Sequence, residues 1–408
     1  MKSAGFAVRG VIEGFYGRPW SHEQRLDLLG FLGARGMNTY VHAPKADRPS
    51  WREAGVEGLG ELAARGRQAG VDVIYCLSPG LSLRYSDAGD VQALCVAFER
   101  AMEAGAAGVG LLLDDIPMRL RHPRDAAAFD DLAAAQVALI EAVFARTGRL
   151  LVCPTVYCGT GDDPYVRALG LIDARIDLFW TGRSICSATI DLADAAAVAR
   201  TLNRAPLYWD NYPVNDVAMG HELHIGPYRG RDRHLYRFAT GVVANGMELY
   251  ESSKIAFATV ADYLRDPEGY DPEESWERAL ADVVGDGADL AAYRLFADNV
   301  RGSCLEPYDA PRLTGVLEQW AFERESGDAA AGDRLLAAHA EELLAAAGHL
   351  LRGPVRRGAL VAEARPWLEE FERGALALLA TARRNVRPHP RRPAPKRVFG
   401  DCLEEFSW

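Results

Sequence analysis

The feature that most constrains the fold is a repeat of short apolar runs, each followed by a longer amphipathic stretch or by room for one. Eight such runs occupy residues 6–14, 38–44, 71–78, 108–115, 149–155, 177–182, 205–211 and 241–249. Eight strand–helix units in roughly 250 residues match the count and length of a TIM (β/α)8 barrel, an α/β fold. A doubly wound open sheet would need fewer strands and usually a phosphate-binding glycine loop, and the early glycines lack that order. We therefore predict a barrel over residues 1–265.

The pattern changes after the stretch DPEGYDPEES at residues 266–275. Strand signals stop, and in an Ala/Leu-rich stretch Leu336, Leu343 and Leu350 recur at heptad spacing. This pattern predicts a small α-helical bundle over residues 266–382, with Pro354 and Pro366 separating its helices. The apolar helices also suggest a homodimer. Residues 383–408 are rich in Arg and Pro and predict a solvated tail, although a site for an anionic partner stays open.

The net charge, the apolar runs and the cysteine content limit the classes of protein to which this chain can belong. The net charge of −11 disfavours a nucleic-acid binder, which needs a basic face. No apolar run approaches the roughly 20 residues that span a bilayer, and Arg9 and Glu13 interrupt any signal-peptide core. The seven cysteines have no framework or zinc-ribbon spacing. We expect a cytoplasmic protein with reduced thiols, no membrane or nucleic-acid partner, and neither metal nor cofactor.

Polar and aromatic residues stand where the predicted strands end, which is where TIM barrels build their sites. The strand ends read EGFYGRPW, APKAD, DDIP, CPTVYCGT, WDNYPVND and ANGMEL. This mixture suits a sugar, whose hydroxyls need polar partners and whose C–H faces need rings. Simpler interpretations stay open: a surface lysine, aromatic packing at the rim, and turn caps at Asn211 and Asp216. His221 and His224 have metal-pair spacing but lack a third ligand.

The pair Asp114–Asp115 directly follows three leucines. One aspartate could cap a following helix, but two adjacent carboxylates at a strand end repel each other and resist ionising together. The pair therefore indicates a functional site. Two other uses stay open: Mg²⁺ binding for phosphoryl or aldol chemistry, and a non-catalytic glycan-binding pocket.

Seven separated motifs resemble glycoside hydrolase family 84, the β-N-acetylglucosaminidases that include protein O-GlcNAcases. The resemblance covers residues 6–265, and the helical remainder is similar to the family's stalk region. The length leaves no room for the acetyltransferase-like domain of animal members. The motifs are GVIEGFYGRPWSHEQR, NTYVHAPKAD, LSPGL, LLLDDI, CPTVYCGT, YWDNYPVND and GPYRGR.

The resemblance implies a role for each matching residue. Asp114 would position the substrate's acetamido group, and Asp115 would be the general acid/base. Two departures are Val156, where animal members tend to have Glu, and residues 246–253, which align loosely. The residues that would bind the sugar are Gly14, Lys45, Tyr157, Trp209, Asn211, Asp216 and Asn245.

The adjacency of the two aspartates favours substrate assistance. Retaining glycosidases that use an enzyme nucleophile place two carboxylates about 5–5.5 Å apart on either side of the anomeric carbon, which neighbours on one strand end cannot easily do. In the alternative, the N-acetyl oxygen attacks and forms an oxazoline. We expect a retaining β-N-acetylglucosaminidase that acts on an N-acetylglucosamine-bearing glycoconjugate or glycoprotein. Repulsion between the aspartates should raise one pKa and keep the acid protonated.

Overall fold

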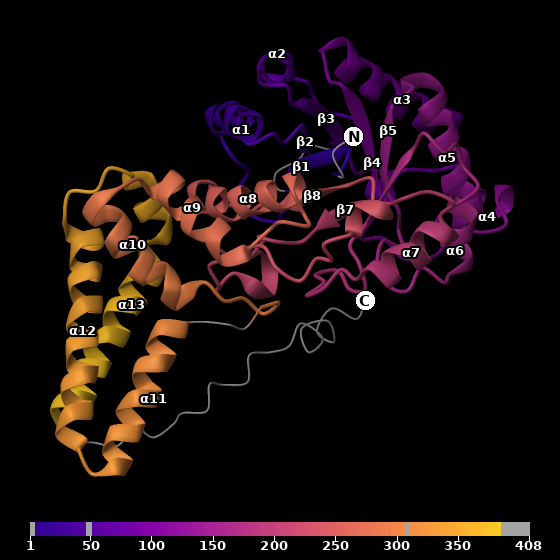
Figure 1. The fold of residues 1–408 in the computed structure, drawn as a ribbon. Coiled ribbons are helices and arrows are strands. Elements are labelled where there is room, and N and C mark those ends of the chain that lie inside the picture. Colours follow the sequence, from indigo (N-terminus) through magenta and orange to yellow (C-terminus); the bar gives the residue numbers. More distant parts are fainter. Residues whose placement is uncertain (1–4, 46–50, 307–309, 385–408) are drawn as a thin grey trace. The chain divides into compact units, whose positions relative to one another are not determined.

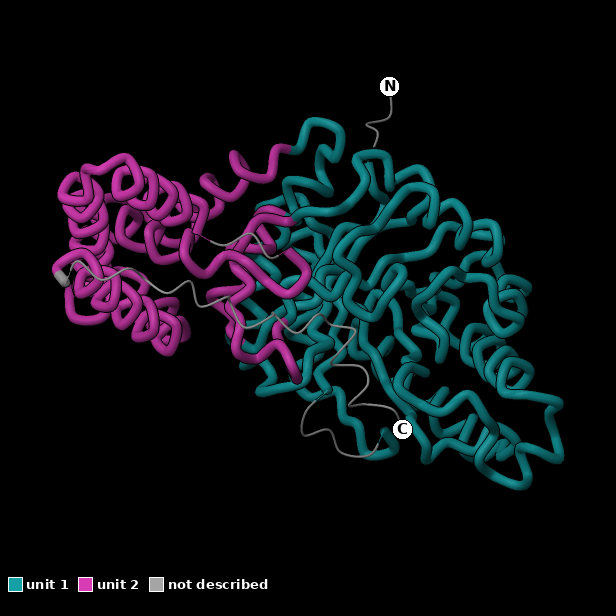
Figure 2. Tube along the Cα trace, turned by 90° about the horizontal axis from the view of Figure 1, so that it is seen from below, with its two compact units in different colours: residues 1–214, 229–248, 260–270 teal, residues 215–228, 249–259, 271–408 magenta. Residues whose placement is uncertain are grey.

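The computed structural model describes residues 5–45, 51–306 and 310–384. The predicted Arg/Pro-rich tail lies outside the described residues except for its first two positions. The chain forms two compact units, shown in two colours in Figure 2. The first contains residues 1–214, 229–248 and 260–270, and the second contains residues 215–228, 249–259 and 271–408. The units are therefore not divided at one point in the chain, and the boundary at residue 265 stays a prediction.

The first unit is a closed barrel of eight parallel strands in sequence order. Figure 1 shows the fold with its elements labelled. It closes where β1 pairs with β8, with Val8 opposite Gly241. Every predicted strand is present, so the TIM-barrel prediction is confirmed. The strands are β1 Val8–Glu13, β2 Thr39–His42, β3 Asp72–Leu77, β4 Gly108–Leu112, β5 Leu150–Cys153, β6 Asp177–Trp180, β7 Leu207–Asp210 and β8 Gly241–Asn245.

Helices follow the strands along the chain. The first begins with a capping box, in which Ser21 and Gln24 satisfy each other's backbone N–H groups. The helices are α1 His22–Ala34, α2 Leu59–Ala69, α3 Ala88–Glu103, α4 Pro123–Ala128, α5 Leu132–Thr147, α6 Pro164–Leu169, α7 Leu192–Thr201 and α8 Tyr250–Arg265. Three short 3₁₀ helices are η1 Gly80–Ser82, η2 Val217–Met219 and η3 Leu235–Arg237.

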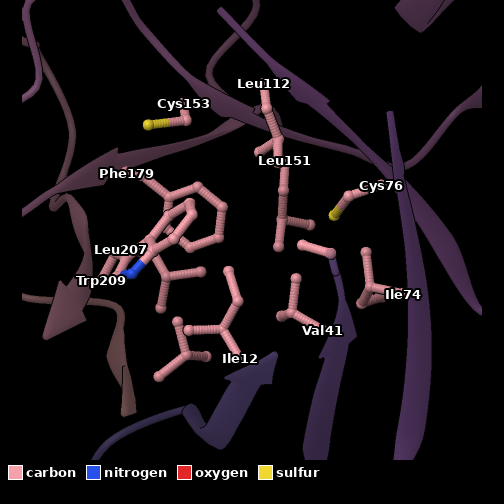
Figure 3. Close-up of a cluster of buried hydrophobic side chains, with 12 residues drawn as sticks. Ile12, Val41, Ile74, Cys76, Leu112, Leu151, Cys153, Phe179, Leu207 and Trp209 are labelled. Carbon is pink, nitrogen blue, oxygen red and sulfur yellow. The ribbon is translucent and has the colours of Figure 1, made fainter. Parts of the chain in front are cut away.

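Side chains fill the barrel interior (Figure 3). The cluster takes at least one buried residue from each strand, as layered packing in a TIM barrel requires. Trp209 packs edge-on against Phe179, with ring centroids 5.5 Å apart. Six of the seven cysteines lie in the described residues, and none of these six forms a disulfide. The cluster consists of Ile12, Val41, Ala43, Ile74, Cys76, Leu112, Leu151, Cys153, Phe179, Leu207, Trp209 and Val243.

The second unit contains the helices after residue 271. The three predicted heptad leucines of α12 are all buried. Pro354 precedes α13, but the prediction that Pro366 also ends a helix is wrong, because α13 continues through it. A proline removes one backbone hydrogen bond, and here apolar residues of α13 on both sides of Pro366 are buried and hold the helix together. The helices are α9 Pro272–Val284, α10 Gly287–Val300, α11 Pro311–Ser326, α12 Ala329–Arg352 and α13 Gly358–Arg384.

The later part of the second unit also forms hydrogen bonds to the two earlier segments of that unit, residues 215–228 and 249–259. The Trp276 indole donates to the Ile225 carbonyl at 2.6 Å, and the backbone N–H of Cys304 donates to Glu222 Oε2 at 2.8 Å. Glu363 accepts from the backbone N–H groups of Glu251 and Ser252 and so caps the start of α8. Among the described residues, no helix combines the length and apolarity needed to cross a bilayer.

Candidate active site

The two adjacent aspartates follow the fourth strand of the barrel. β4 ends at Leu112, and the backbone N–H of Leu113 still donates to the Cys153 carbonyl at 2.8 Å. Asp114 then leaves the sheet, and Asp115 has a φ of 58°. This left-handed conformation is uncommon outside glycine, but aspartate adopts it more readily than most residues. After this turn both carboxylates reach the same cation, Lys45.

A buried polar network supports the strand end just before the aspartates. Thr155, after β5, donates its hydroxyl to the Leu113 carbonyl at 2.8 Å. Gln136 of α5 donates to the same hydroxyl oxygen at 2.8 Å, and the Tyr165 hydroxyl donates to Gln136 Oε1. Because each buried polar group has a partner, the network fixes the backbone from which Asp114 and Asp115 project.

Lys45 comes from the end of β2 and joins the two carboxylates. Its Nζ lies 2.6 Å from Asp114 Oδ2 and 3.4 Å from Asp115 Oδ2. Burial opposes the charge of Lys45, but the two carboxylates overcome this and raise its pKa. The ammonium also lies 5.3 Å and 5.5 Å from the ring centroids of Tyr16 and Trp209. The site therefore contains a permanent cation between its two acids.

Two tyrosine hydroxyls donate to Asp115, one to each oxygen. Tyr157 donates to Oδ1 at 3.0 Å and Tyr16 donates to Oδ2 at 2.8 Å. Burial alone would raise the pKa of Asp115, but the charge of Lys45 and these hydrogen bonds lower it below its ordinary value. The sequence led us to expect a raised pKa for the acid of the pair, so the lowered pKa of Asp115 is opposite to that expectation. Sequence reasoning counted the repulsion between carboxylates and did not count the cation and hydroxyls around them.

Asp114 has one oxygen without a partner. Its side chain is only 7% exposed, and Oδ1 has no hydrogen-bond partner among the described residues. Buried carboxylate oxygens are normally satisfied, because an unpaired buried acceptor costs about 1–3 kcal/mol. The Trp209 indole N–H is likewise buried and lacks a partner in the described part of the chain. An acceptor and a donor are thus both available near Lys45.

A chain of hydrogen bonds joins the ends of β1, β8 and β7. The Gly14 N–H donates to Asn245 Oδ1 at 3.1 Å, and Asn245 Nδ2 donates to Asn211 Oδ1 at 3.0 Å. Asn211 Nδ2 then donates to the Ile185 carbonyl at 2.8 Å. A Cβ on Gly14 would lie 2.4 Å from Cζ2 of Trp209, so glycine allows this ring to approach the backbone. These four site residues are therefore neighbours.

Glu13, the last residue of β1, forms a second buried carboxylate site. Arg25 of α1 donates to both oxygens of Glu13, at 2.7 Å and 2.8 Å. The Tyr40 hydroxyl donates to Oε2, and the backbone N–H of Trp20 donates to Oε1 at 3.2 Å. Burial would raise the pKa of Glu13, but Arg25 and His42 lower it to about 2. Glu13 directly precedes Gly14. The ion pair therefore holds the backbone next to a residue of the candidate site.

A family model for beta-N-acetylglucosaminidase matches residues 9–298, which include all of the barrel strands except the first residue of β1. The chain belongs to this family, within glycoside hydrolase family 84. It is 34% identical over 273 residues to the protein O-GlcNAcase of Rattus norvegicus, covering 63% of this chain and 30% of that protein. The chain thus spans less than a third of the length of this curated relative.

Two solved structures resemble this member of family 84. A mutant of the O-GlcNAc hydrolase of Thermobaculum terrenum superposes with a TM-score of 0.87 at 34% identity, over 92% of this chain and 84% of that chain. CpGH84B superposes with a TM-score of 0.82 at 25% identity, over 98% of this chain and 72% of that chain. The second covers nearly all of this chain, so the similarity extends beyond the barrel.

The barrel unit brings together eight of the nine residues that the resemblance to family 84 assigned. The ninth, Asp216, precedes η2 and belongs to the second unit, so its role stays a prediction. The interpretation of His221 and His224 as a metal pair gains no support, because His224 Nε2 pairs with Glu222 at 2.7 Å and no described group of three or more His, Cys, Asp or Glu could hold a metal. The assigned residues in the barrel unit are Gly14, Lys45, Asp114, Asp115, Tyr157, Trp209, Asn211 and Asn245.

Sequence reasoning missed Tyr16, which contacts one of the two aspartates directly. The signal was present in the family motif GFYG, where an aromatic residue stands between glycines at a strand end. Gly17 has a φ of 139°, and Glu248 accepts from the backbone N–H of Arg18 at 2.8 Å. This turn places the Tyr16 hydroxyl near Asp115, about a hundred residues later in the chain.

Proposed function

We propose that the chain is a retaining β-N-acetylglucosaminidase that removes terminal β-linked N-acetylglucosamine from a glycoconjugate or glycoprotein, with the substrate's own acetamido group as nucleophile. The observation that carries this proposal is the unpaired, buried Oδ1 of Asp114 beside the more exposed carboxylate of Asp115. Membership in the β-N-acetylglucosaminidase family supports it, as do relatives named O-GlcNAcase and O-GlcNAc hydrolase.

Asp114 is suited to orient the acetamido group. Its unpaired Oδ1 would accept the acetamide N–H, while Lys45 holds Oδ2 at 2.6 Å. This hydrogen bond would turn the acetamido oxygen toward the anomeric carbon and stabilise the positive charge that develops on the nitrogen. Intramolecular attack then benefits from effective molarities that reach about 10⁵ M or more in well-oriented systems.

Asp115 would act first as the general acid and then as the general base. As the acetamido oxygen bonds to the anomeric carbon, the glycosidic bond breaks, and a protonated Asp115 gives its proton to the departing oxygen. Water then attacks the oxazoline from the vacated face and transfers a proton back to Asp115. Two inversions give net retention. Since the ligand-free environment favours ionised Asp115, the enzyme must protonate this carboxylate before the glycosidic bond breaks.

The remaining residues would bind the sugar. Their roles come from the family resemblance. Gly14 and Lys45 would contact hydroxyls, and Tyr157 would line the acetamido pocket with Trp209 and Asn211 beside it. Asp216 would hold the 4- and 6-hydroxyls, with Asn245 at the same end of the sugar. The hydrogen-bonded chain from Gly14 through Asn245 to Asn211 supports a single site to which all three groups contribute. A homodimer through the helical unit and a cytoplasmic location are further proposals from the sequence.

One assay separates the proposal from its rivals. The protein is incubated with an aryl β-N-acetylglucosaminide and with the matching aryl β-glucoside, each with and without EDTA. We expect hydrolysis of the first substrate only, since the second lacks the nucleophile. Comparable turnover of both substrates contradicts substrate assistance, and loss of activity in EDTA favours the Mg²⁺ interpretation. Binding of N-acetylglucosamine without turnover would indicate a glycan-binding module.

A further inference from the structure

The two tyrosines on Asp115 create a conflict with its proposed task. A general acid needs a proton on the oxygen that faces the leaving group, whereas hydroxyl donors aimed at a carboxylate favour its ionised form. Both oxygens of Asp115 accept such a donor. These hydrogen bonds therefore oppose protonation of Asp115, and the loss of one of them makes protonation easier.

The two tyrosines are not held equally. The backbone carbonyl of Tyr157 accepts from the Thr181 N–H at 2.8 Å, and its side chain packs against the buried cluster inside the barrel. Tyr16 is 49% exposed and lies in the turn after β1, next to Gly17 in the left-handed region. Tyr16 is thus the donor that can leave Asp115 at the smaller cost.

The charges around Asp115 explain why the hydroxyl of Tyr16 matters. The groups that face this carboxylate are Asp114 beside it, Lys45 from the end of β2, Tyr16 from the turn after β1, and Tyr157 and the buried Cys153 thiol from β5 and its end. Lys45 is shared with Asp114, to which it is closer. Burial and, to a smaller extent, the Asp115 carboxylate raise the pKa of Tyr16 to about 12, although Lys45 opposes this, so Tyr16 keeps its proton at neutral pH and remains a donor.

We propose that Tyr16 is a positioning residue that keeps Asp115 ionised until substrate binds, and that its release from Oδ2 allows this oxygen to take up a proton from solvent. Asp115 then passes that proton to the glycosidic oxygen as the bond to the sugar breaks, and the tyrosine's own proton is never transferred. Tyr157 remains on Oδ1 throughout and keeps the carboxyl group aimed. This inference rests on the proposed glycosidase function.

The test is the pH profile of Tyr16→Phe. Without the hydroxyl, ionised Asp115 loses a hydrogen bond, so its pKa rises and a larger fraction is protonated on the alkaline side of the optimum. There kcat/KM for a substrate with a poor leaving group, such as an alkyl or Ser-linked N-acetylglucosaminide, should increase about three- to tenfold relative to wild type, which corresponds to roughly half to one pKa unit. An activated aryl substrate, which hardly needs the acid, should show no such gain.

Tyr236→Phe is the matched control, because Tyr236 also donates its hydroxyl to a carboxylate, that of Glu268, outside the site. This variant should keep the wild-type pH profile. An unchanged alkaline side in Tyr16→Phe, or an equal loss with both substrates, overturns the proposal and leaves the glycosidase function standing. If the wild-type protein hydrolyses neither substrate, the proposed function itself fails.

Discussion

Two carboxylate sites at the C-terminal ends of the barrel strands differ in how their oxygens are partnered. Glu13, the last residue of β1, is fully buried, and Arg25, Tyr40 and Trp20 satisfy both of its oxygens. The pair after β4 combines a buried oxygen of Asp114, which has no partner within the described part of the chain, with an Asp115 side chain that is 46% exposed. The first arrangement is that of a structural ion pair, whereas the second leaves binding capacity for a ligand.

The comparison shows that a carboxylate at a strand end is not by itself evidence of catalysis. Glu13 and Asp114 both follow apolar residues at a strand end, and in the sequence Asp114 differs by the second carboxylate beside it. The partners of their oxygens distinguish the two sites further, and the sequence does not reveal those partners. Substitutions at the two sites should therefore separate effects on activity from effects on stability.

The largest expected effect is on catalysis at the β4 site. Asp115→Asn should lower kcat/KM by about 10²–10⁴-fold for poor leaving groups and far less for activated aryl glycosides, because only the former need a proton. Asp114→Asn should slow good and poor leaving groups by similar factors. The measurement is kcat/KM across aryl glycosides of graded leaving-group pKa. Steeper dependence in the Asp114 variant alone would reverse the two roles, and no steepening in either variant would rule out the assignment.

The next effect concerns stability at the β1 site. Glu13→Gln leaves Arg25 buried without its countercharge, so the free energy of unfolding at pH 7 should fall by about 3 kcal/mol. Because folding lowers the pKa of Glu13 from 4.5 to about 2, this contribution is present above pH 4.5 and is lost as the pH falls toward 2. Urea unfolding of both proteins between pH 3 and pH 7 measures it.

The control for Glu13 is Glu61→Gln. Glu61 pairs with His22 at 2.8 Å, but its side chain is 66% exposed, so little change in unfolding is expected. Equal effects of the two substitutions, or a Glu13 effect that does not depend on pH, would show that the buried ion pair is not what stabilises this strand end.

The smallest effect is expected at Asp216, a carboxylate whose role rests on the family resemblance. Asp216→Ala should lower kcat/KM. The loss should correspond to roughly 1–3 kcal/mol of transition-state stabilisation, the size expected when a hydrogen bond to a charged group is lost. The same variant should lose little affinity for an analogue that lacks the 4- and 6-hydroxyls. Unchanged kinetics with the complete sugar would place Asp216 outside the sugar site.

Much of the fold could be predicted from the sequence because the barrel repeats a local pattern. Each strand is a short apolar run, and cues such as the Ser21–Gln24 capping box act within a few residues. The continuation of α13 through Pro366 could not be predicted, since it depends on packing of residues on both sides. Local sequence patterns therefore predict most helices and strands, and tertiary packing determines where those predictions fail.

The site was predictable in its residues but not in its electrostatics. Asp114, Asp115 and Lys45 follow from strand ends and family motifs. The lowered pKa of Asp115 depends on Lys45 and on two tyrosines that lie 99 and 42 residues away along the chain. In the folded protein the cation and the hydroxyls outweigh the repulsion between the neighbouring carboxylates.

The hydrogen bonds between the later helical region and two earlier segments of the chain limit which parts of this protein can be exchanged with those of a relative. Residues 215–228 and 249–259 are tied to the later helices by Trp276, by the backbone of Cys304 and by Glu363. A gene fusion that exchanged everything after residue 270 would keep all eight strands but remove these anchors. The barrel and the helices are therefore expected to have been inherited together, and protein engineers should exchange them together with both earlier segments.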